Sequence, residues 1–305
     1  MPFKLKKLHS PKKQRAFLFL INELGLTQKE AQRHIAHGRL FINGVVMNTP
    51  TAEVEGDFEF VVYEPSTRGL KPFVEEENFV VFNKPSGVLI HPQNRNTEYS
   101  LVDELKYQFG LGANIAHRID QETSGLVLCA KDKQSEKDIK MLFEERKIDK
   151  KYLALVHGHF KEEIVIEEPL LRREDESAIV RMVVKVHPDG KSSKTTITPL
   201  EYLEDKDMTL VECKPFTGRQ HQIRVHLFHV KHPIVGDPIY GQSEEDVLKF
   251  LDKTISLDER LKKSGATRLL LHANELEFNL YSNVYHIMSD ENFINTCLNS
   301  MKALA

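Results

Sequence analysis

The sequence predicts an α+β fold in two parts: a large domain built on a mixed, largely antiparallel β-sheet with flanking helices, and a small α/β domain ahead of it. Two observations lead to this prediction. Strand-like apolar runs outnumber helical ones and rarely alternate with them, which disfavours a doubly wound parallel sheet. The 305 residues suffice for a large and a small domain, and a segment bounded by prolines at 65–72 can link them. We therefore expect domains at residues 1–65 and 66–305.

The small domain is expected to contain two short helices followed by a hairpin and a strand. Thr27 and, three residues later, Glu30 form the pattern of a capping box at a helix start. Asn43 and Gly44 lie between short apolar runs, where this pair favours a tight hairpin turn. The expected elements are helices at 14–24 and 28–37, hairpin strands at 39–42 and 45–46, and a strand at 58–63.

The large domain is expected to contain short apolar strands with few helices between them. Its clearest helix is amphipathic, since Ile139, Leu142 and Phe143 recur on one face. Ser100 is suited to cap another helix. The expected strands are 79–82, 126–128, 152–156, 179–186, 195–202, 208–213 and 269–280, and the expected helices are 101–109, 135–146, 219–230 and 244–261.

Composition is that of a globular protein, with 40% hydrophobic and 29% charged residues. No apolar run approaches the roughly 18–20 residues of a membrane span, and the basic N-terminus lacks the apolar stretch of a secretion signal. Cys129, Cys213 and Cys297 are far apart and odd in number, which predicts reduced thiols in a cytoplasmic protein. The 14 histidines form no set with metal-ligand spacing, so we expect no metal.

Charge is unevenly distributed although the net charge is only −3. Residues 1–39 hold nine lysines and arginines against two acids, whereas residues 53–78 are rich in glutamate. A basic face on an otherwise acidic protein suits a polyanionic partner. A solvated surface with a loose tail accounts for the same charges, and charge alone leaves both interpretations open.

Four short segments carry chemically active residues. The first, His117-Arg118-Ile119-Asp120, puts a cation and a carboxylate just ahead of an apolar strand, where rigid backbone can hold them. The others are Lys150-Lys151-Tyr152, Gly218–His226 (GRQHQIRVH) and Leu270–Ala273 (LLHA). In this order and spacing, they resemble the RluA-type family of RNA pseudouridine synthases. Ile119 replaces that family's usual leucine, and Gln220 its usual threonine or serine; both changes spare the charged residues.

The small domain resembles a second known unit. Two helices followed by the hairpin sequence GRLFINGVV (38–46) are similar to the S-four-like RNA-binding domain, named for a ribosomal protein. Arg33 and His34 stand where that family has a sharper arginine pattern. The resemblance implies that this domain binds RNA, with Arg33 and Arg39 among the contacting residues. A generic α/β cap is the alternative.

The first resemblance implies an isomerase that converts uridine in RNA to pseudouridine. The reaction breaks the bond between uracil and ribose, turns the base, and rejoins it through ring carbon 5, so no cofactor is needed. The resemblance makes Asp120 the reacting carboxylate and Arg224 its counter-ion. A guanidinium suits that place because it stays charged and can grip a carboxylate with two nitrogens. Tyr152 is expected to stack on the base and to help remove the proton from carbon 5.

The resemblance also implies RNA contacts around Asp120. A base inside folded RNA must leave its stack before it reacts, and Arg118 is expected to fill the vacated space. We expect His117 to orient the turn through a hydrogen bond, and we group it with Lys150 and Arg219 as RNA-contacting residues. The substrate is expected to be large-subunit ribosomal RNA or tRNA, bound by a monomer.

Two alternatives stay open at this point. A glycosidase or nucleosidase usually needs two facing carboxylates, and Glu122 is the only other acid in the Asp120 segment. A non-catalytic RNA-binding ribosome assembly factor could use the same surfaces without a reaction. Asp120, Tyr152 and Arg224 together favour the enzyme, because binding alone does not require this set.

Overall fold

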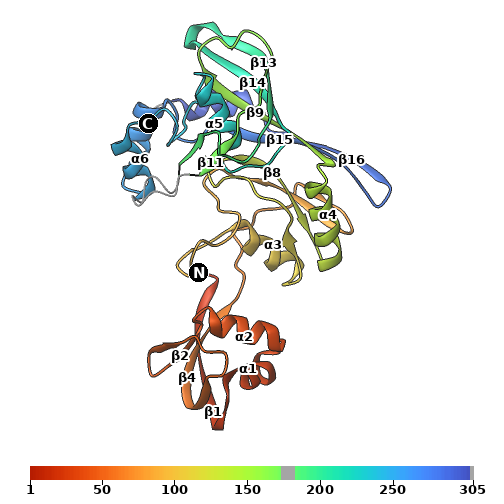
Figure 1. Cartoon of the computed structure of the whole chain (residues 1–305), viewed down its shortest axis with the longest axis vertical. Coiled ribbons are helices and arrows are strands. Elements are labelled where there is room, and N and C mark those ends of the chain that lie inside the picture. Colours follow the sequence, from red (N-terminus) through yellow and green to blue (C-terminus); the bar gives the residue numbers. More distant parts are fainter. Residues whose placement is uncertain (173–182, 303–305) are drawn as a thin grey trace. The chain divides into compact units, whose positions relative to one another are not determined.

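The computed structural model describes residues 1–172 and 183–302, and the chain divides into two compact units (Figure 1). The first unit contains residues 1–68 and 92–104, and the second contains residues 69–91 and 105–305. The sequence placed residues 92–104 in the large domain. They group with the small unit through contacts such as the hydrogen bond of 2.9 Å from Arg95 Nη2 to the carbonyl of His37.

The first unit is a four-stranded antiparallel sheet with two helices packed on it. The strand order is β1-β4-β2-β3. Phe17 and Leu20 from the first helix and Ile35 from the second bury their side chains with Phe60 of the sheet. The elements are β1 Phe3–Arg15, α1 Ala16–Leu24, α2 Gln28–Ala36, β2 Leu40–Ile42, β3 Val45–Met47 and β4 Glu53–Tyr63.

The N-terminal basic run is strand β1, so the interpretation of a loose tail is wrong. It pairs antiparallel with the acidic strand β4 along most of its length. Lys4 lies 2.6 Å from Glu64, and Lys13 lies 2.9 Å from Glu53. The basic and acidic runs of the sequence therefore partly neutralise each other across this strand pair.

The second unit is built on one ten-stranded sheet (Figure 1). Its path is β10-β13-β14-β9-β15-β8-β6-β5, with β16 beside β15 and β7 beside β8. Within the described residues, each strand pair is antiparallel except β8 with β15, which confirms the predicted largely antiparallel α+β fold. The strands are β5 Val74–Glu75, β6 Phe79–Lys84, β7 Asn114–Ile115, β8 Ser124–Ala130, β9 Ile148–His157, β10 Ile164–Ile166, β13 Thr195–Leu203, β14 Met208–Pro215, β15 Leu271–Leu280 and β16 Asn283–Met288.

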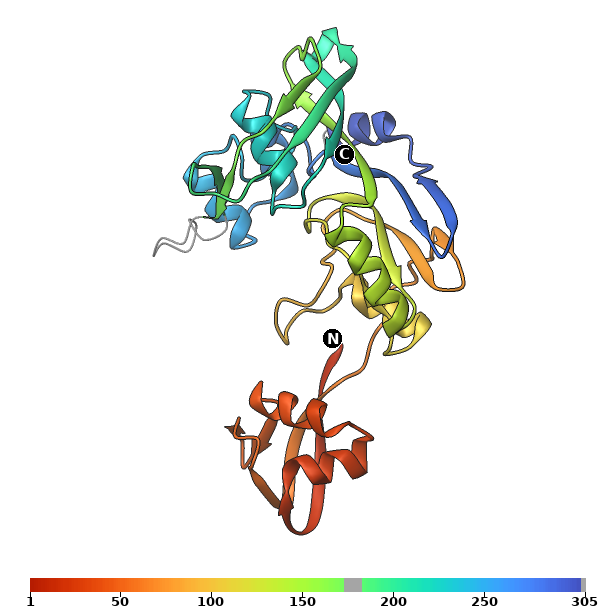
Figure 2. The ribbon, with the colours of Figure 1, turned by 45° about the vertical axis from the view of Figure 1, so that its right-hand side comes forward.

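Helices cover this sheet and complete its core. Helix α4 packs against β7 and β8, and α5 packs against β13, β14 and β12 of a separate two-stranded sheet (Figure 2). Leu126 and Leu128 of β8 bury their side chains with Ile139 of α4. The remaining elements are α3 Leu101–Phe109, α4 Lys133–Glu144, β11 Leu170–Arg172, β12 Val184–Val186, α5 Gln222–His229, α6 Glu244–Leu251, α7 Leu257–Ser264 and α8 Phe293–Ser300.

Several predicted boundaries are wrong for local reasons. Helix α1 starts at Ala16, because the two residues before it still pair with β4. The expected helix 244–261 is two helices, since Ser256 caps the second by accepting a hydrogen bond from the backbone of Glu259. The expected strand 179–186 is seen as β12, and residues 179–182 lie outside the described part of the chain. The elements that were not predicted are the strands β1, β5, β7, β10, β11 and β16 and the helix α8.

The parallel pair β8–β15 meets unusually closely at Gly125. This glycine has φ +109°, and a Cβ placed on it would lie 2.3 Å from the carbonyl oxygen of Ala273. Ala273 in turn pairs with Tyr152 of β9. The missing side chain of Gly125 therefore lets β8, which follows Asp120, lie close to β15, and β15 pairs on its other side with β9, which carries Tyr152.

Candidate active site

A cavity of about 550 Å³ in the second unit is lined by all four segments singled out in the sequence. Seven of the nine predicted site residues contribute to its wall: His117, Arg118, Asp120, Lys150, Tyr152, Arg219 and Arg224. They come from the turn before β8, the first half of β9, and the loop and helix that follow β14. Its size is within the range of about 300–1,000 Å³ typical of ligand sites.

Arg224 has two carboxylate partners, and Asp120 is the weaker one. Its Nε and Nη2 each donate a hydrogen bond of 2.8 Å to Asp237, while Nη1 lies 3.4 Å from Oδ2 of Asp120. The side chains of Arg224 and Asp237 are 2% and 1% exposed, whereas that of Asp120 is 24% exposed. Arg224 is thus a buried cation between a structural carboxylate and one that faces the cavity.

Mutual attraction keeps the buried pair charged. Burial alone disfavours both charges, but Asp237 outweighs it and raises the pKa of Arg224. Burial likewise opposes the charge on Asp237, and Arg224 nevertheless lowers the pKa of that carboxyl. The backbone N–H groups of Ile239 and Tyr240 also donate to Asp237, at 2.9 and 3.0 Å.

His221 is a site residue that the sequence interpretation missed. Its Nε2 lies 3.9 Å from Oδ2 of Asp120, and its Nδ1 lies 2.9 Å from the hydroxyl of Tyr240. Burial, followed by the charge of Arg224, lowers the pKa of His221 to about 4, so the ring is neutral at pH 7. The backbone N–H of Val184 donates to the Tyr240 oxygen, which leaves the hydroxyl proton for Nδ1. Nδ1 is then the acceptor, so the single N–H of the neutral ring is on Nε2 and faces Asp120.

His221 also explains why α5 starts three residues later than predicted. Its backbone is left-handed, with φ 54°, and it precedes the first helical residue, Gln222. The only signal for its role was its place inside the GRQHQIRVH segment. Tyr240 and Asp237 lie beyond that segment, and no spacing in the sequence connects them to Asp120.

Tyr152 is half-buried on β9, and its ring lines the cavity. Burial and the charge of Asp120 raise the pKa of its hydroxyl, so it is protonated at neutral pH. The hydroxyl makes no hydrogen bond to any described residue. A proton-removing role therefore requires an acceptor, such as Asp120, for the phenolic proton, whereas stacking on a base requires only the ring.

The two residues before Ile119 differ sharply in exposure. Arg118 is exposed on the cavity wall and makes no hydrogen bond or ion pair to the described part of the chain. His117 accepts a hydrogen bond of 2.9 Å from the backbone of Leu128 and stacks on Phe143 with ring centroids 4.6 Å apart. Burial, then the charge of Lys150, lowers the pKa of His117 to about 3, so the ring is neutral.

A buried lysine holds the backbone beside Asp120. Lys84, at the end of β6, is fully buried and donates from Nζ to the carbonyls of Pro85, Val88 and Gln121 at 2.8–3.0 Å. Burial lowers its pKa to about 7, and the three carbonyl oxygens favour the protonated amine, which alone offers three donors. Lys84 thereby connects the turn after β6 with the residue that follows Asp120.

The other two predicted site residues, Arg33 and Arg39, belong to the first unit. Arg33 is exposed near the end of α2, and Arg39 lies over the ring of Phe3 with its Cζ 5.2 Å from the centroid. Burial, then the charges of Arg39 and Arg33, lowers the pKa of His34 to about 4. A local cluster of positive charge is formed by Arg33, Arg39 and Arg95, and the charge of Arg95 also acts on Arg39.

One group of described side chains has the ligand types of a metal site. Potential ligand atoms of Glu275, Glu277 and His286 lie within 4.8 Å of one another on β15 and β16. Glu275 is already bound by His286 at 2.9 Å and by Lys151 at 3.2 Å. The ammonium group of Lys151 thus already offers Glu275 the positive charge that a metal ion would supply.

No helix in the described ranges is both long and apolar enough to cross a membrane.

Comparison with known proteins decides the family. A family model described as RNA pseudouridylate synthase matches residues 78–229. An uncharacterized RNA pseudouridine synthase of Helicobacter pylori is 36% identical over 289 residues, which cover 95% of this chain and 96% of the relative. The chain belongs to the RNA pseudouridine synthase family. As a member, it is an isomerase that converts uridine to pseudouridine in RNA.

Other relatives of this synthase carry names with different RNA substrates. Ribosomal large subunit pseudouridine synthase D of Zymomonas mobilis is 34% identical, over 60% of this chain and 59% of its own. The mitochondrial tRNA pseudouridine(32) synthase of Saccharomyces cerevisiae is 34% identical, over 70% of this chain and 47% of its own. The solved structure of human RNA Pseudouridylate Synthase Domain Containing 1 is 26% identical with a TM-score of 0.60, covering 77% of the synthase and 89% of that chain.

Proposed function

We propose that the synthase performs its isomerisation in the cavity around Asp120, with that residue as the reacting carboxylate. The observation that supports this most directly is the contact of Asp120 with the buried guanidinium of Arg224 at 3.4 Å. The guanidinium, which stays charged, can pair with the carboxylate and hold it toward the cavity. Asp120 then acts as nucleophile or base on a flipped nucleotide while the uracil–ribose bond breaks and the base turns and rejoins through carbon 5.

The surrounding residues would divide the remaining tasks. Tyr152 presents its ring to the base, and its hydroxyl takes part in removing the proton from carbon 5 once its own proton has an acceptor. Arg118, exposed and without a hydrogen-bond or ion-pair partner among the described residues, fills the space that the flipped base leaves. Lys150 and Arg219 on the cavity wall would meet RNA phosphates.

The substrate we propose is structured RNA, with large-subunit ribosomal RNA first and tRNA second. The relatives' names include both classes, and the cluster of Arg33, Arg39 and Arg95 gives the first unit a positive surface suited to phosphates. We further propose a cytoplasmic monomer. All three cysteines are free and buried, as is usual for a protein of a reducing compartment.

The test is a pseudouridine map of total RNA from a strain without the gene, complemented with native protein, Asp120→Asn or Glu144→Gln. Glu144 is an exposed acid on the same cavity wall and is the matched control. We expect native protein and Glu144→Gln to restore the lost sites and Asp120→Asn to restore none, although it still binds RNA. Equal rescue by Asp120→Asn would contradict the proposed mechanism. A strain without the gene that loses no pseudouridine site would favour a non-catalytic assembly factor.

A further inference from the structure

An exposed phenylalanine stands on the wall of the active-site cavity. Phe216 lies between β14 and α5, lines the cavity and is 41% exposed. Its backbone N–H donates to the carbonyl of Lys194 at 3.0 Å, which extends the β13–β14 ladder by one step. The backbone that carries this aromatic ring is therefore held by the sheet, while a large part of the ring remains available to a partner.

Two lysines flank this ring. Nζ of Lys194 lies 5.5 Å and Nζ of Lys214 lies 5.8 Å from the ring centroid of Phe216. Within the described part of the chain, the ion-pair partner of each ammonium group is an exposed carboxylate, Glu167 for Lys194 and Asp149 for Lys214. Exposed ion pairs of this kind contribute little to stability, so both lysines can exchange these partners for phosphates at small cost.

The loop around the ring is rigid because of one buried side chain. The amide oxygen of Gln222 accepts from the hydroxyl of Thr217 at 2.7 Å and from the backbone of Arg219 at 3.0 Å. Its amide nitrogen donates to the carbonyl of Lys194 and to the hydroxyl of Thr195 at 3.0 and 2.9 Å. Gln222 thus fixes the loop before any ligand arrives, and a preorganised surface loses less entropy on binding.

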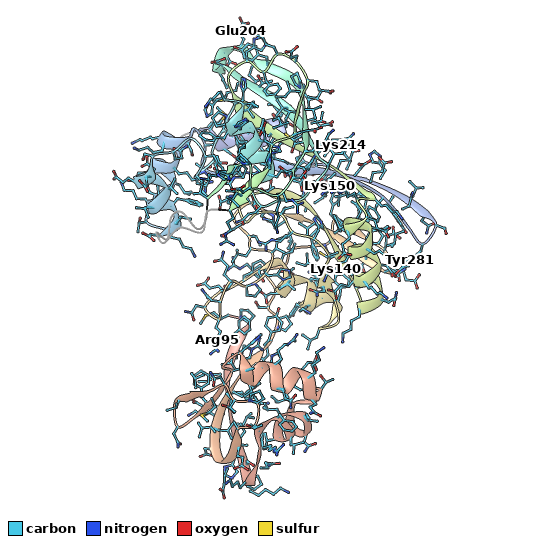
Figure 3. All side chains as sticks on the ribbon, viewed as in Figure 1. Arg95, Lys140, Lys150, Glu204, Lys214 and Tyr281 are labelled. Atoms are coloured by element: carbon cyan, nitrogen blue, oxygen red, sulfur yellow. The ribbon has the colours of Figure 1, made fainter. Side chains whose placement is uncertain are left out.

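We propose that Phe216 is a stacking platform for an unpaired nucleotide next to the reacting uridine, and that Lys194 and Lys214 take its phosphates. Single-stranded RNA is bound by this combination of an aromatic face with basic residues. The inference rests on the proposed function, because it assigns the neighbour of the base that enters the Asp120 cavity. Figure 3 labels Lys214 and Lys150 close together in one view, and Asp149, which pairs with Lys214, directly precedes Lys150 in β9.

The test uses the full chain and a ten-nucleotide oligouridylate with one central 2-aminopurine, a base whose fluorescence falls when it stacks. We expect the native protein and Phe216→Tyr to quench this fluorescence. Phe216→Leu should abolish the quenching and weaken binding by roughly ten-fold, as for loss of one stacked base. Phe228→Leu is the matched control, since Phe228 is 42% exposed but does not line the cavity.

The lysines are tested by the salt dependence of binding to the same oligonucleotide. Lys194→Gln and Lys214→Gln should each reduce the slope of log affinity against log salt by about 0.7, the value for one phosphate contact with a single strand. Equal quenching and affinity for Phe216→Leu and the native protein would overturn the platform, and unchanged slopes would remove the lysines from it.

These results are independent of the chemistry. Asp120→Asn should quench and bind the oligonucleotide like the native protein, because it keeps the platform. On an RNA with a mapped site, Phe216→Leu should raise KM and leave kcat near the native value. Loss of kcat in Asp120→Asn without any effect of Phe216→Leu would refute the platform and keep the proposed function. Native kcat in Asp120→Asn, together with lost quenching in Phe216→Leu, would refute the proposed function alone.

Discussion

Arg224 binds Asp237 through two hydrogen bonds of 2.8 Å and reaches Asp120 with its remaining nitrogen at 3.4 Å. The counter-ion of the cavity carboxylate is thus positioned by a second, fully buried carboxylate. One guanidinium thus serves two carboxylates, and it binds the buried one more tightly. We infer that Asp237 sets the geometry of Arg224 and that Asp120 retains the freedom to react.

Replacing Asp237 should destabilise the protein strongly. Asp237→Ala leaves the buried guanidinium without its main partner, a change that typically costs about 3–5 kcal/mol. Asp237→Asn keeps an acceptor oxygen and should cost less. Urea unfolding measures both, with Asp290→Ala as an exposed control expected within about 0.5 kcal/mol of the native value. An unfolding free energy of Asp237→Ala equal to that of the control would show that the pair contributes nothing.

Two substitutions separate the ring of Tyr152 from its hydroxyl. Tyr152→Phe keeps the stacking surface, so RNA affinity should stay native, while kcat should fall by about 10²-fold because the proposed proton-transfer group is lost. Tyr152→Leu should lower both kcat and affinity, the latter by about 1–3 kcal/mol for a lost stacking contact. Steady-state kinetics with RNA titrations give both numbers. Native kcat in Tyr152→Phe would restrict the residue to stacking.

Buried neutral histidines should make the protein sensitive to mild acid. The pKa of His117 is lowered to about 3 from 6.5. Between these values the unfolded chain binds a proton and the folded protein does not, so the unfolding free energy falls as pH falls below 6.5. Fully buried, one such group contributes about 1.4 kcal/mol per pH unit, and partial exposure reduces this. His117→Gln keeps an acceptor for Leu128 but cannot titrate, so it should lose less stability than native protein between pH 7 and 5.

The control for this measurement is His229→Gln, which alters an exposed histidine at the end of α5. It should follow the native protein across the pH range. His221, whose pKa is lowered to about 4, contributes in the same direction, so His117→Gln should reduce the pH dependence without abolishing it. Identical pH dependence in His117→Gln and native protein would exclude His117 as a source.

Local signals predicted the fold where neighbouring residues decide the structure. The capping box at Thr27 and the hairpin turn at Asn43-Gly44 are both present. Strand β1 was missed because its partner, β4, is distant in the chain, and because its lysines on the exposed face hide the alternation. The split between α6 and α7 was missed although its signal is local. Charged residues continue through the break and hide it, and the cap at Ser256 is a single residue.

The site was predictable only as far as the four segments extend. Their order and spacing identified the cavity residues, since the segments lie in or next to β8, β9, β14 and β15, which converge there. The choice of Asp237 over Asp120 as the main partner of Arg224 depends on the path of the chain beyond α5. The hydrogen bond of His221 to Tyr240 depends on it too. Such pairings follow from tertiary packing, which one sequence does not reveal.

The structure distinguishes neutralised lysines from available arginines in the first unit. Arg33 is exposed near the end of α2 without an ion-pair partner among the described residues, whereas Lys4 lies 2.6 Å from Glu64. Arg33→Gln should weaken RNA binding and reduce the salt slope of log affinity by about 0.7–0.9, the value for one phosphate contact. Lys4→Gln should change neither by a comparable amount. Fluorescence anisotropy at several salt concentrations measures this, and equal slopes for both variants would exclude a phosphate contact at Arg33.

Gly125 should be the least replaceable glycine near the site. Gly125→Ala forces a left-handed φ of +109° on an L residue and places a methyl group 2.3 Å from the carbonyl of Ala273. Strain and overpacking together should cost about 3 kcal/mol or more. The β8–β15 pair must then separate, which moves the strand after Asp120 away from the strand of Tyr152. Activity should therefore fall even in the folded fraction. Gly112→Ala, with an ordinary φ and open space around it, is the matched control and should retain native stability and turnover; equal loss in both variants would mean that the close approach of the strands is not what the site requires.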